Sequence, residues 1–187
     1  MEKKQRFLIV VDVQNDFIDG SLRNEEAIKK VPNIVKKIKE FDGDFIFATM
    51  DTHTENYLKT SEGEKLPVEH CIKGTDGWKI NKDVKKALDE SKVPVIFIEK
   101  PTFGSYGLVE RINKVFNHDA YGADIEFVGY CTDICVVSNA LLVKAAFFET
   151  SNISVDASCC AGVTPETHKA ALTTMKMCQI NIVNEDE

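Results

Sequence analysis

Short apolar runs of strand length alternate with longer amphipathic segments of helix length along the whole chain. The apolar runs are rich in β-branched residues and too short for helices, which indicates strands buried on both faces. We expect six strands, at residues 7–13, 45–50, 93–98, 125–129, 153–157 and 180–183. Strand–helix alternation specifies a parallel sheet covered on both faces, because each right-handed crossover buries its apolar stripe against the sheet. The sequence therefore predicts an α/β fold, a three-layer αβα, Rossmann-like domain with a six-stranded, mostly parallel sheet.

The amphipathic segments predict the helices and the residues that begin them. Apolar residues at three- and four-residue spacing predict a helix over 24–41, in which Pro32 marks either a kink or a late start. Asp83 is expected to cap a short helix ending near residue 91, and another helix is expected over 108–116. Asp133 is expected to cap a helix over 136–150 that is apolar nearly all round and hence buried. Pro165 in a first helical turn opens the last helix.

The 187 residues are consistent with one domain spanning 1–187. Residues 52–82 are polar and lack a sustained periodicity. Irregular stretches of about this length are uncommon inside a compact domain and are often functional. We therefore expect an active-site loop insertion at about 52–82.

Charge and cysteine content exclude several classes of protein. The net charge of −7 argues against sequence-independent binding to nucleic acid. No apolar run approaches the ~20 residues that cross a bilayer, and the N-terminus has no secretory cleavage pattern. Six cysteines without a C-x-x-C pair indicate reduced thiols and a cytoplasmic protein. The apolar helix over 136–150 favours a homo-oligomer.

Charged or nucleophilic side chains follow three of the predicted strands. Asp12 lies inside the first apolar run, Lys100 follows the third, and Cys135 follows the fourth at the start of a helix. Each has an ordinary interpretation: a turn-capping acid, a solvated lysine and a small buried hydrophobe. Because ligands bind at the carboxyl ends of parallel strands, we expect the three to converge in one crevice. There Asp12 can take the thiol proton while Lys100 and the helix N-terminus lower the pKa of Cys135.

The polar loop holds a candidate metal site. Asp51, His53, Glu62 and His70 form an irregularly spaced set of two carboxylates and two histidines. Such ligands suit Zn²⁺, Fe²⁺ or Mn²⁺ with positions open to water or substrate. Solvated loop histidines are the alternative. His118 and His168 look solvated, and Trp78 looks like a core residue.

The chain resembles the isochorismatase-like cysteine hydrolases, and within them the nicotinamidases. The matching segments are DVQNDF (12–17), MDTH (50–53), HCIKGTDGW (70–78), EKPTFGSY (99–106) and GYCTDICV (129–136). The resemblance implies Asp12 as proton acceptor, Lys100 as its cationic partner and Cys135 as nucleophile. It further implies an oxyanion hole from the backbone N–H groups of Cys131 and Cys135, and a cis peptide bond between Tyr130 and Cys131.

The same resemblance implies the ligands of a divalent metal and the residues around the substrate. Asp51, His53 and His70 match metal ligands, and the ion, zinc with iron or manganese as alternatives, would bind a pyridine nitrogen and water. The substrate-binding residues that it implies are Phe17, Phe103 and Tyr130.

Two departures from the family pattern affect these expectations. Lys59 stands where the family's common pattern has a histidine, so Glu62, or Glu64 as second candidate, is expected to complete the metal site. Residues 66–69 replace an aromatic residue that often precedes the second metal histidine. This leaves room for an amide other than nicotinamide.

The predicted function is hydrolysis of a small primary amide, nicotinamide to nicotinate and ammonia, through a cysteine thioester. One alternative is an amidohydrolase of the same family acting on another amide, carbamoyl or ureido substrate. A second is a non-catalytic binding domain with the same fold.

Overall fold

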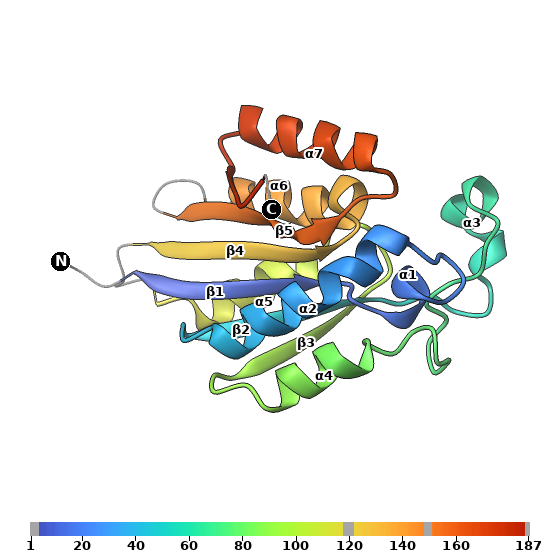
Figure 1. Ribbon diagram of the computed structural model, residues 1–187, viewed down its shortest axis with the longest axis horizontal. Coiled ribbons are helices and arrows are strands. Elements are labelled where there is room, and N and C mark those ends of the chain that lie inside the picture. Colours follow the sequence, from blue (N-terminus) through green and yellow to red (C-terminus); the bar gives the residue numbers. More distant parts are fainter. Residues whose placement is uncertain (1–3, 118–121, 148–150, 186–187) are drawn as a thin grey trace.

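The structure is a computed structural model that describes residues 4–117, 122–147 and 151–185. Within these residues one all-parallel sheet has the strand order β3-β2-β1-β4-β5-β6 (Figure 1). This confirms the α/β fold with a six-stranded parallel sheet. The strands are β1 (Gln5–Val11), β2 (Phe45–Asp51), β3 (Val95–Lys100), β4 (Ala123–Tyr130), β5 (Asn152–Ala161) and β6 (Asn181–Val183).

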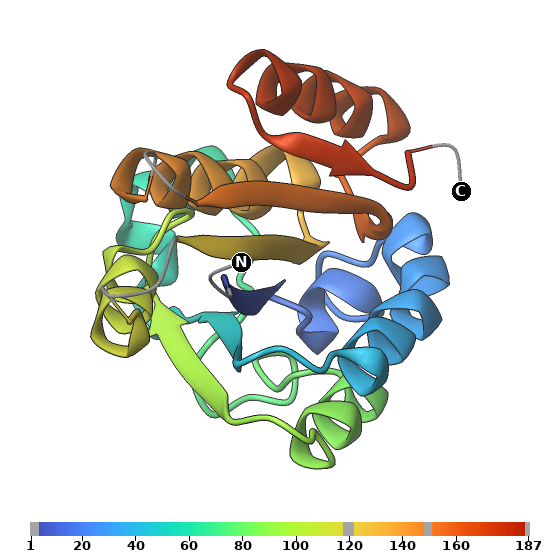
Figure 2. The ribbon, with the colours of Figure 1, turned by 90° about the vertical axis from the view of Figure 1, so that its left-hand side faces the viewer.

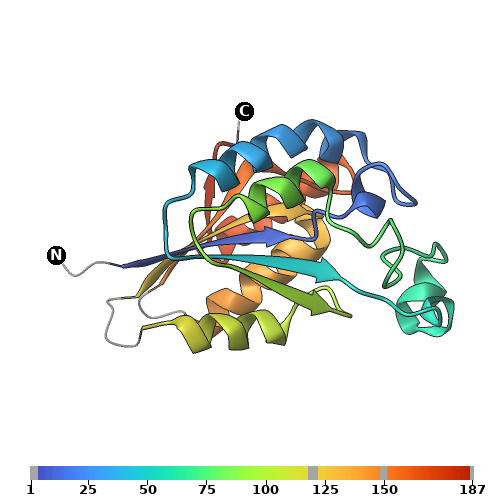
Figure 3. The ribbon, with the colours of Figure 1, turned by 90° about the horizontal axis from the view of Figure 1, so that it is seen from below.

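Helices cover both faces of the sheet, as Figures 2 and 3 show. One face carries α2 (Glu25–Glu40) and α4 (Lys82–Asp89), which pack against each other. The other carries α5 (Tyr106–Val115), α6 (Val137–Ala146) and α7 (Pro165–Met177). Within the described residues, none of the helices is both long and apolar enough to span a membrane.

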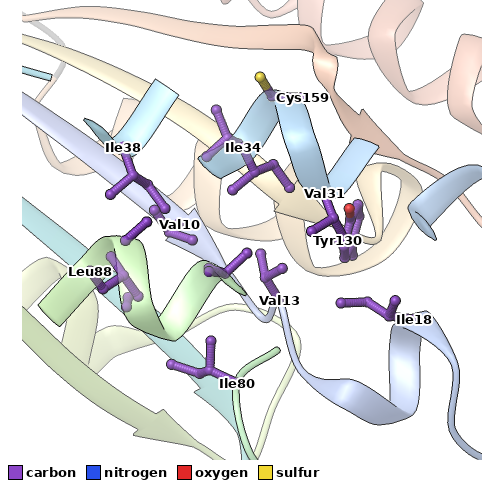
Figure 4. Close-up of a cluster of buried hydrophobic side chains, with 14 of the residues drawn as sticks. Val10, Val13, Ile18, Val31, Ile34, Ile38, Ile80, Leu88, Tyr130 and Cys159 are labelled. Atoms are coloured by element: carbon purple, nitrogen blue, oxygen red, sulfur yellow. The ribbon is translucent and has the colours of Figure 1, made fainter. Parts of the chain in front are cut away.

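Two apolar clusters fill the space between the sheet and its helices. Alternate residues of β1 point to opposite faces, as the pleat of a strand requires: Leu8 and Val10 join the cluster under α2 and α4, whereas Ile9 joins the one under α5, α6 and α7. Figure 4 shows the first cluster, in which Val10 lies close to Ile38 of α2 and Leu88 of α4. Burial on both faces explains why β1 is a continuous apolar run.

The direction in which strands are added to the sheet changes between β1 and β4. The chain adds β2 and β3 on one side of β1, then returns to add β4, β5 and β6 on the other. The crossovers on the two sides therefore diverge at this point, which is where open α/β sheets bind ligands. In Figure 1 the strand arrows point to the end of the molecule that carries α1 (Asn15–Ile18) and α3 (Ser61–Lys65).

Several predicted boundaries shift in the structure. The first strand ends at Val11 and the third begins at Val95, two residues from their expected limits. The helix α2 begins at Glu25, capped by the side chain of Asn24, so Pro32 is an interior residue and marks no late start. The loop over 52–82 is less irregular than expected, because it contains α3 and a 3-10 turn, Tyr57–Lys59.

Two predicted helix caps are wrong. The cap of α4 is Asn81 rather than Asp83, because the helix begins two residues earlier than expected. Asp133 caps nothing, since it lies inside a π-helical turn, Thr132–Val136, that precedes α6. The predicted end of that helix falls at 148–150, outside the described residues. Within α6 only Asn139, Ala140 and Val143 are buried, so the helix is less buried than expected. Self-association through this helix stays a prediction.

Candidate active site

A cavity of about 1190 Å³ opens at the carboxyl ends of the strands. The sequence-predicted residues that line it are Phe17, Asp51, His53, Glu62, His70, Phe103, Cys131 and Cys135. Asp12 and Lys100 are buried, with exposed fractions of 0% and 1%. The structure therefore brings the predicted residues of three strands and the polar loop to one place.

Asp12 stands directly beyond the end of β1 in a left-handed backbone conformation, with φ of 49°. Its N–H donates to Thr49 O at 3.2 Å, and its Oδ1 accepts from the hydroxyl of Thr49 at 2.7 Å. Burial raises the pKa of this carboxyl, and the charge of Lys100 opposes that rise only in part. A raised pKa suits a group that must accept a proton and then return it.

Lys100 connects the acid to the thiol. Its Nζ lies 2.7 Å from Asp12 Oδ2 and 3.5 Å from Cys135 Sγ, and it donates to Thr102 O at 3.0 Å. Burial acts to lower the pKa of this amine, but the surrounding negative charges, Asp12 foremost, raise it above its usual range. Lys100 is therefore a fixed positive charge between two groups that can exchange a proton.

The pKa of Cys135 differs in direction from the sequence prediction. Burial raises the pKa of its thiol well above the usual value, and Asp12 adds to that rise while Lys100 opposes it. Lys100 acts to lower the pKa as expected, but the desolvation of a thiolate outweighs this attraction, so the expected net lowering is wrong. A raised pKa means that attack by Cys135 needs a group beside it that takes the thiol proton.

The turn that carries Cys135 follows a cis peptide bond between Tyr130 and Cys131. Gly129, with φ of 119°, precedes this bond, and a Cβ there would lie 2.1 Å from Val11 O. Only glycine allows β4 to approach the end of β1 this closely. Cys131 O accepts the N–H of Ile134 at 3.1 Å and that of Val136 at 3.0 Å. Cys131 and Cys135, whose N–H groups are predicted to bind an oxyanion, therefore lie near the two ends of one tight turn.

Asp51, His53 and His70 form a group of possible metal ligands whose donor atoms all lie within 4.8 Å of one another. The Oε1 of Glu62 lies 3.8 Å from His53 Nε2 and 3.6 Å from His70 Nε2. Glu64, the second candidate, is exposed. Although burial opposes it, hydrogen bonds from the two histidines hold the pKa of Asp51 below its usual range.

This donor set fits a divalent metal ion. Two imidazoles with one or two carboxylates are ligands that zinc, iron and manganese accept. His70 Nδ1 lies 2.9 Å from Val68 O, a contact that leaves Nε2 facing the other donors. Metal-ligating histidines commonly have such a partner on the second nitrogen.

Two residues beside the metal-ligand group, Tyr57 and Gln14, support the site and were not predicted from the sequence. The ring of Tyr57 contacts those of His53 and His70, with centroids 4.7 and 4.8 Å away. Gln14 accepts Asp51 N–H at 2.7 Å and donates to Asp51 O at 2.8 Å. Their signals were a lone aromatic in a polar loop and an amide directly after an apolar strand.

Asn139 supports the site from α6. Its Nδ2 donates to the carbonyls of Phe103 at 2.9 Å and Cys135 at 2.8 Å, and its Oδ1 accepts Ser105 N–H at 2.9 Å. The amide thus joins the segment after β3 to the turn after β4. A polar residue in an otherwise apolar helix was the available signal.

The predicted substrate-binding residues separate into two groups. Phe17 lies edge-on to His70, with ring centroids 5.7 Å apart, and lines the cavity. Phe103 also lines the cavity and is 44% exposed. The side chain of Tyr130 is buried in the core and donates to Ala27 O at 2.6 Å, so it is not available to a substrate. Its aromatic ring lies among the apolar side chains of the cluster under α2 (Figure 4), and Tyr130 is not among the residues that line the cavity.

The remaining predictions concern histidines and the tryptophan. Trp78 is partly buried against the core, and its indole N–H donates to Thr52 Oγ1 at 2.9 Å. His168 is not solvated as expected, because it is half-buried and its Nδ1 lies 2.8 Å from Thr132 Oγ1. His118 lies outside the described residues.

Comparisons with known proteins agree with this architecture. The family model described as isochorismatase domain matches residues 6–186. The nicotinamidase/pyrazinamidase of Mycobacterium tuberculosis is 29% identical over 192 residues, covering 95% of this chain and 98% of that protein. The structure of nicotinamidase/pyrazinamidase from Bacillus subtilis matches with a TM-score of 0.79 and 24% identity over 95% of this chain and 98% of that one.

A second solved structure, the pyrazinamidase of Pyrococcus horikoshii in complex with zinc, matches with a TM-score of 0.73 and 26% identity. The match covers 96% of this chain and 98% of that one. Since the family model spans nearly the whole sequence, this chain belongs to the isochorismatase family.

Proposed function

We propose that this protein hydrolyses the amide bond of a small primary amide, and that its substrate is nicotinamide, which it converts to nicotinate and ammonia. One observation carries the proposal. Lys100 Nζ contacts both Asp12 Oδ2, at 2.7 Å, and Cys135 Sγ, at 3.5 Å, beside a cavity at the sheet's switch point. The 29% identity to the nicotinamidase/pyrazinamidase of Mycobacterium tuberculosis supports the choice of substrate class.

The first half of the reaction forms a thioester. Cys135 Sγ attacks the amide carbonyl carbon as its proton passes to the carboxylate of Asp12. The N–H groups of Cys131 and Cys135 stabilise the oxyanion, and one such donor contributes about 3–4 kcal/mol in the transition state. Asp12 then gives the proton to the departing nitrogen, and ammonia leaves. Lys100 keeps a positive charge beside the proton-transfer path throughout.

The second half restores the enzyme. A water molecule attacks the thioester carbon as Asp12 accepts one of its protons. The tetrahedral intermediate collapses to the carboxylic acid, and the proton on Asp12 returns to the released sulfur. The raised pKa of Asp12 supports this double role, since the carboxyl both accepts and donates within one cycle.

A divalent ion, which we propose to be zinc, would be held by Asp51, His53, Glu62 and His70. When bound it supplies an electrophile that can coordinate a ring nitrogen or water at the cavity wall. The zinc in the Pyrococcus horikoshii structure supports this choice. This chain's own residues orient the ligands: Gln14 holds the backbone of Asp51, and Tyr57 packs against both imidazoles.

The cavity volume favours a second candidate substrate class. A volume of about 1190 Å³ lies above the roughly 300–1,000 Å³ usual for small-molecule sites, and nicotinamide would occupy a small part of it. A larger amide, carbamoyl or ureido compound could use the same Asp12–Lys100–Cys135 chemistry. The Asp12–Lys100–Cys135 contacts also favour an enzyme over a non-catalytic domain.

The test is ammonia release from nicotinamide, pyrazinamide and a panel of unrelated amides and ureido compounds, with and without a chelator. We expect turnover of the two ring amides by the wild type and none by Cys135→Ala, with Cys178→Ala, an exposed cysteine, as the matched control. Appreciable turnover by Cys135→Ala would refute the thioester. Turnover of the panel compounds alone would favour the second substrate class.

A further inference from the structure

The turn that carries the nucleophile is tied to the junction between β5 and α7. Thr132, the first residue of this turn, is fully buried. Its hydroxyl lies 2.8 Å from Nδ1 of His168, which is 36 positions further along the chain on α7. Thr132 stands between Cys131 and Cys135 in sequence, so a force on its side chain acts directly on the backbone between the two N–H groups.

A second contact joins the same two segments. Both carboxylate oxygens of Asp133 accept the backbone N–H of Val163, at 3.2 and 3.0 Å. Successive residues of the turn therefore contact successive parts of the β5–α7 junction. The turn is held from outside as well as by its own hydrogen bonds.

The junction itself leaves His168 little freedom to move. A Cβ on Gly162 would lie 2.9 Å from the Cα, Cβ and N of His168, so the backbones pack in direct contact. Thr164 and Thr167 form a reciprocal capping box at the start of α7, and His168 N–H donates to Thr164 O at 2.9 Å. Asn24, at the start of α2, donates to Gly162 O at 2.8 Å.

The chemistry of His168 matches the role of a hydrogen-bond acceptor. Burial lowers the pKa of its imidazole, and the positive charge of Lys30 lowers it further. A neutral imidazole offers one ring nitrogen as an acceptor. Its Nδ1 can therefore receive the hydroxyl proton of the buried Thr132.

We propose that His168 is a positioning residue that acts through Thr132 to hold the N–H groups of Cys131 and Cys135 on the developing oxyanion. The inference rests on the proposed function. A displacement of about 1 Å in a reacting group can cost roughly 100-fold in rate. Loss of the His168–Thr132 contact is expected to lower kcat by roughly 10- to 100-fold with little change in KM, because the ground-state carbonyl depends less on these donors.

The discriminating experiment compares two ligands of the same ring, pyridine-3-carbaldehyde and nicotinate. The thiol of Cys135 adds across the aldehyde C=O: the S–C bond forms, the π pair goes to oxygen, and the thiol proton ends on that oxygen or on Asp12. The carbon of the adduct is therefore tetrahedral, and its oxygen occupies the oxyanion position. Nicotinate, in contrast, forms no bond to sulfur. Dissociation constants are measured for wild type, His168→Ala, Thr132→Val and the double variant.

We expect each single variant to bind the aldehyde at least about 10-fold more weakly, with nicotinate binding unchanged. The double variant should be no weaker than the singles, since both remove one contact. Thr132→Ser keeps the hydroxyl and should restore aldehyde binding. Lys169→Ala, at the exposed neighbour on α7, is the control and should match the wild type.

Three results overturn the inference: equal weakening of both ligands, additive losses in the double variant, or wild-type aldehyde binding in Thr132→Val. Thermal unfolding identifies a variant that fails to fold. If His168→Ala fails to fold, the aldehyde affinity of Thr132→Val alone decides the role of His168, because valine and threonine have nearly the same volume. A wild-type protein that binds the aldehyde but hydrolyses no amide overturns the proposed function, while the ligand comparison still decides the role of His168. A wild type that binds neither ligand overturns both.

Discussion

Among the described residues, the buried carboxylates of Asp12 and Asp156 each pair with a lysine, and the two pairs differ in their surroundings. In the proposed catalytic cluster, Asp12 accepts from Thr49 and pairs with Lys100 at 2.7 Å. In the second, on the α2 side of the sheet, Asp156 of β5 pairs with Lys37 at 2.6 Å. Both carboxylates have exposed fractions of 1% or less.

The hydrogen bonds of the two acids are different. Asp156 also accepts from the N–H and the hydroxyl of Ser158, at 3.0 and 2.7 Å, and from Asn184 at 3.1 Å. Although burial opposes it, these donors and Lys37 hold the pKa of Asp156 below its usual value. Asp12 has fewer donors and faces the negative charge of Asp51, so burial prevails and its pKa is raised.

The contrast shows that a buried ion pair does not by itself indicate a catalytic acid. An acid surrounded by donors stays ionised and has a structural role. An acid with few donors, a like charge nearby and a thiol on the far side of its lysine can take up and release a proton. The number of donors and the neighbouring charges distinguish the two sites.

The largest expected effect comes from removing the carboxylate charge in the catalytic cluster. Asp12→Asn should lower kcat by roughly 10²- to 10⁴-fold, the usual contribution of a general acid–base group. Asparagine tolerates the left-handed backbone at this position, so the fold is expected to persist. Ammonia release measures the effect, and Asp156→Asn, which is expected to retain the wild-type kcat, is the matched control.

Equal kcat values for Asp12→Asn and wild type would break the comparison, because the two clusters would then have the same structural role. A large loss of kcat in a correctly folded Asp156→Asn protein would also contradict the comparison, because Asp156 would then contribute to catalysis. Circular dichroism identifies the folded fraction in both cases.

The second prediction concerns stability. Asp156→Asn should lower the free energy of unfolding by about 1.5–3 kcal/mol, the range for hydrogen bonds to a charged group. Urea unfolding at neutral pH measures the change. Glu126→Gln removes the other, more exposed partner of Lys37 and should cost less than about 1 kcal/mol.

The pH dependence of the Asp156→Asn effect follows from the pKa of Asp156, which lies below its usual value of 3.8. Below its unfolded pKa an acid of this kind binds more protons in the unfolded chain than in the folded one. Its stabilisation is therefore present above about pH 4 and lost as the pH falls through the lower, folded pKa. The gap between wild type and Asp156→Asn should close on acidification, and a gap that widens instead would contradict the assignment.

The smallest effect is expected where the catalytic cluster meets the metal-ligand group, since Asp51 lies near both Lys100 and the histidines. Glu62→Gln should weaken zinc binding by about 10-fold, because one carboxylate ligand is replaced by a neutral amide. Glu64→Gln, two residues further along α3 and exposed, should bind zinc as the wild type does. Competition with a chromophoric chelator measures both, and equal affinities would remove Glu62 from the site.

Much of the fold was predictable from local pattern. Continuous apolar runs such as residues 7–11 occur because central parallel strands are buried on both faces, and this property is visible in one dimension. Helix caps were less predictable. Asn81 and Asp83 both suit a cap, and only the hydrogen bond from Asp83 N–H to Asn81 Oδ1 shows which one begins α4.

The site was predictable to the extent that polar residues stand out at strand ends. Asp12, Lys100 and Cys135 were found because each interrupts or ends an apolar segment. Tyr130 was misplaced because side chains of a strand alternate between faces, and its register places the ring under α2. His168 was missed because its partner, Thr132, is far away in sequence.

The order of residues along the chain determined the class of fold, the strand-end positions of the reactive groups and the family resemblance, because periodicity and motif spacing are local properties. Only the tertiary structure decided which acid among several buried ones has a raised pKa, that burial raises the pKa of the Cys135 thiol, and that Glu62 rather than Glu64 lies beside the histidines. Desolvation and charge–charge interactions act through space, and they depend on neighbours that segments distant in sequence bring together.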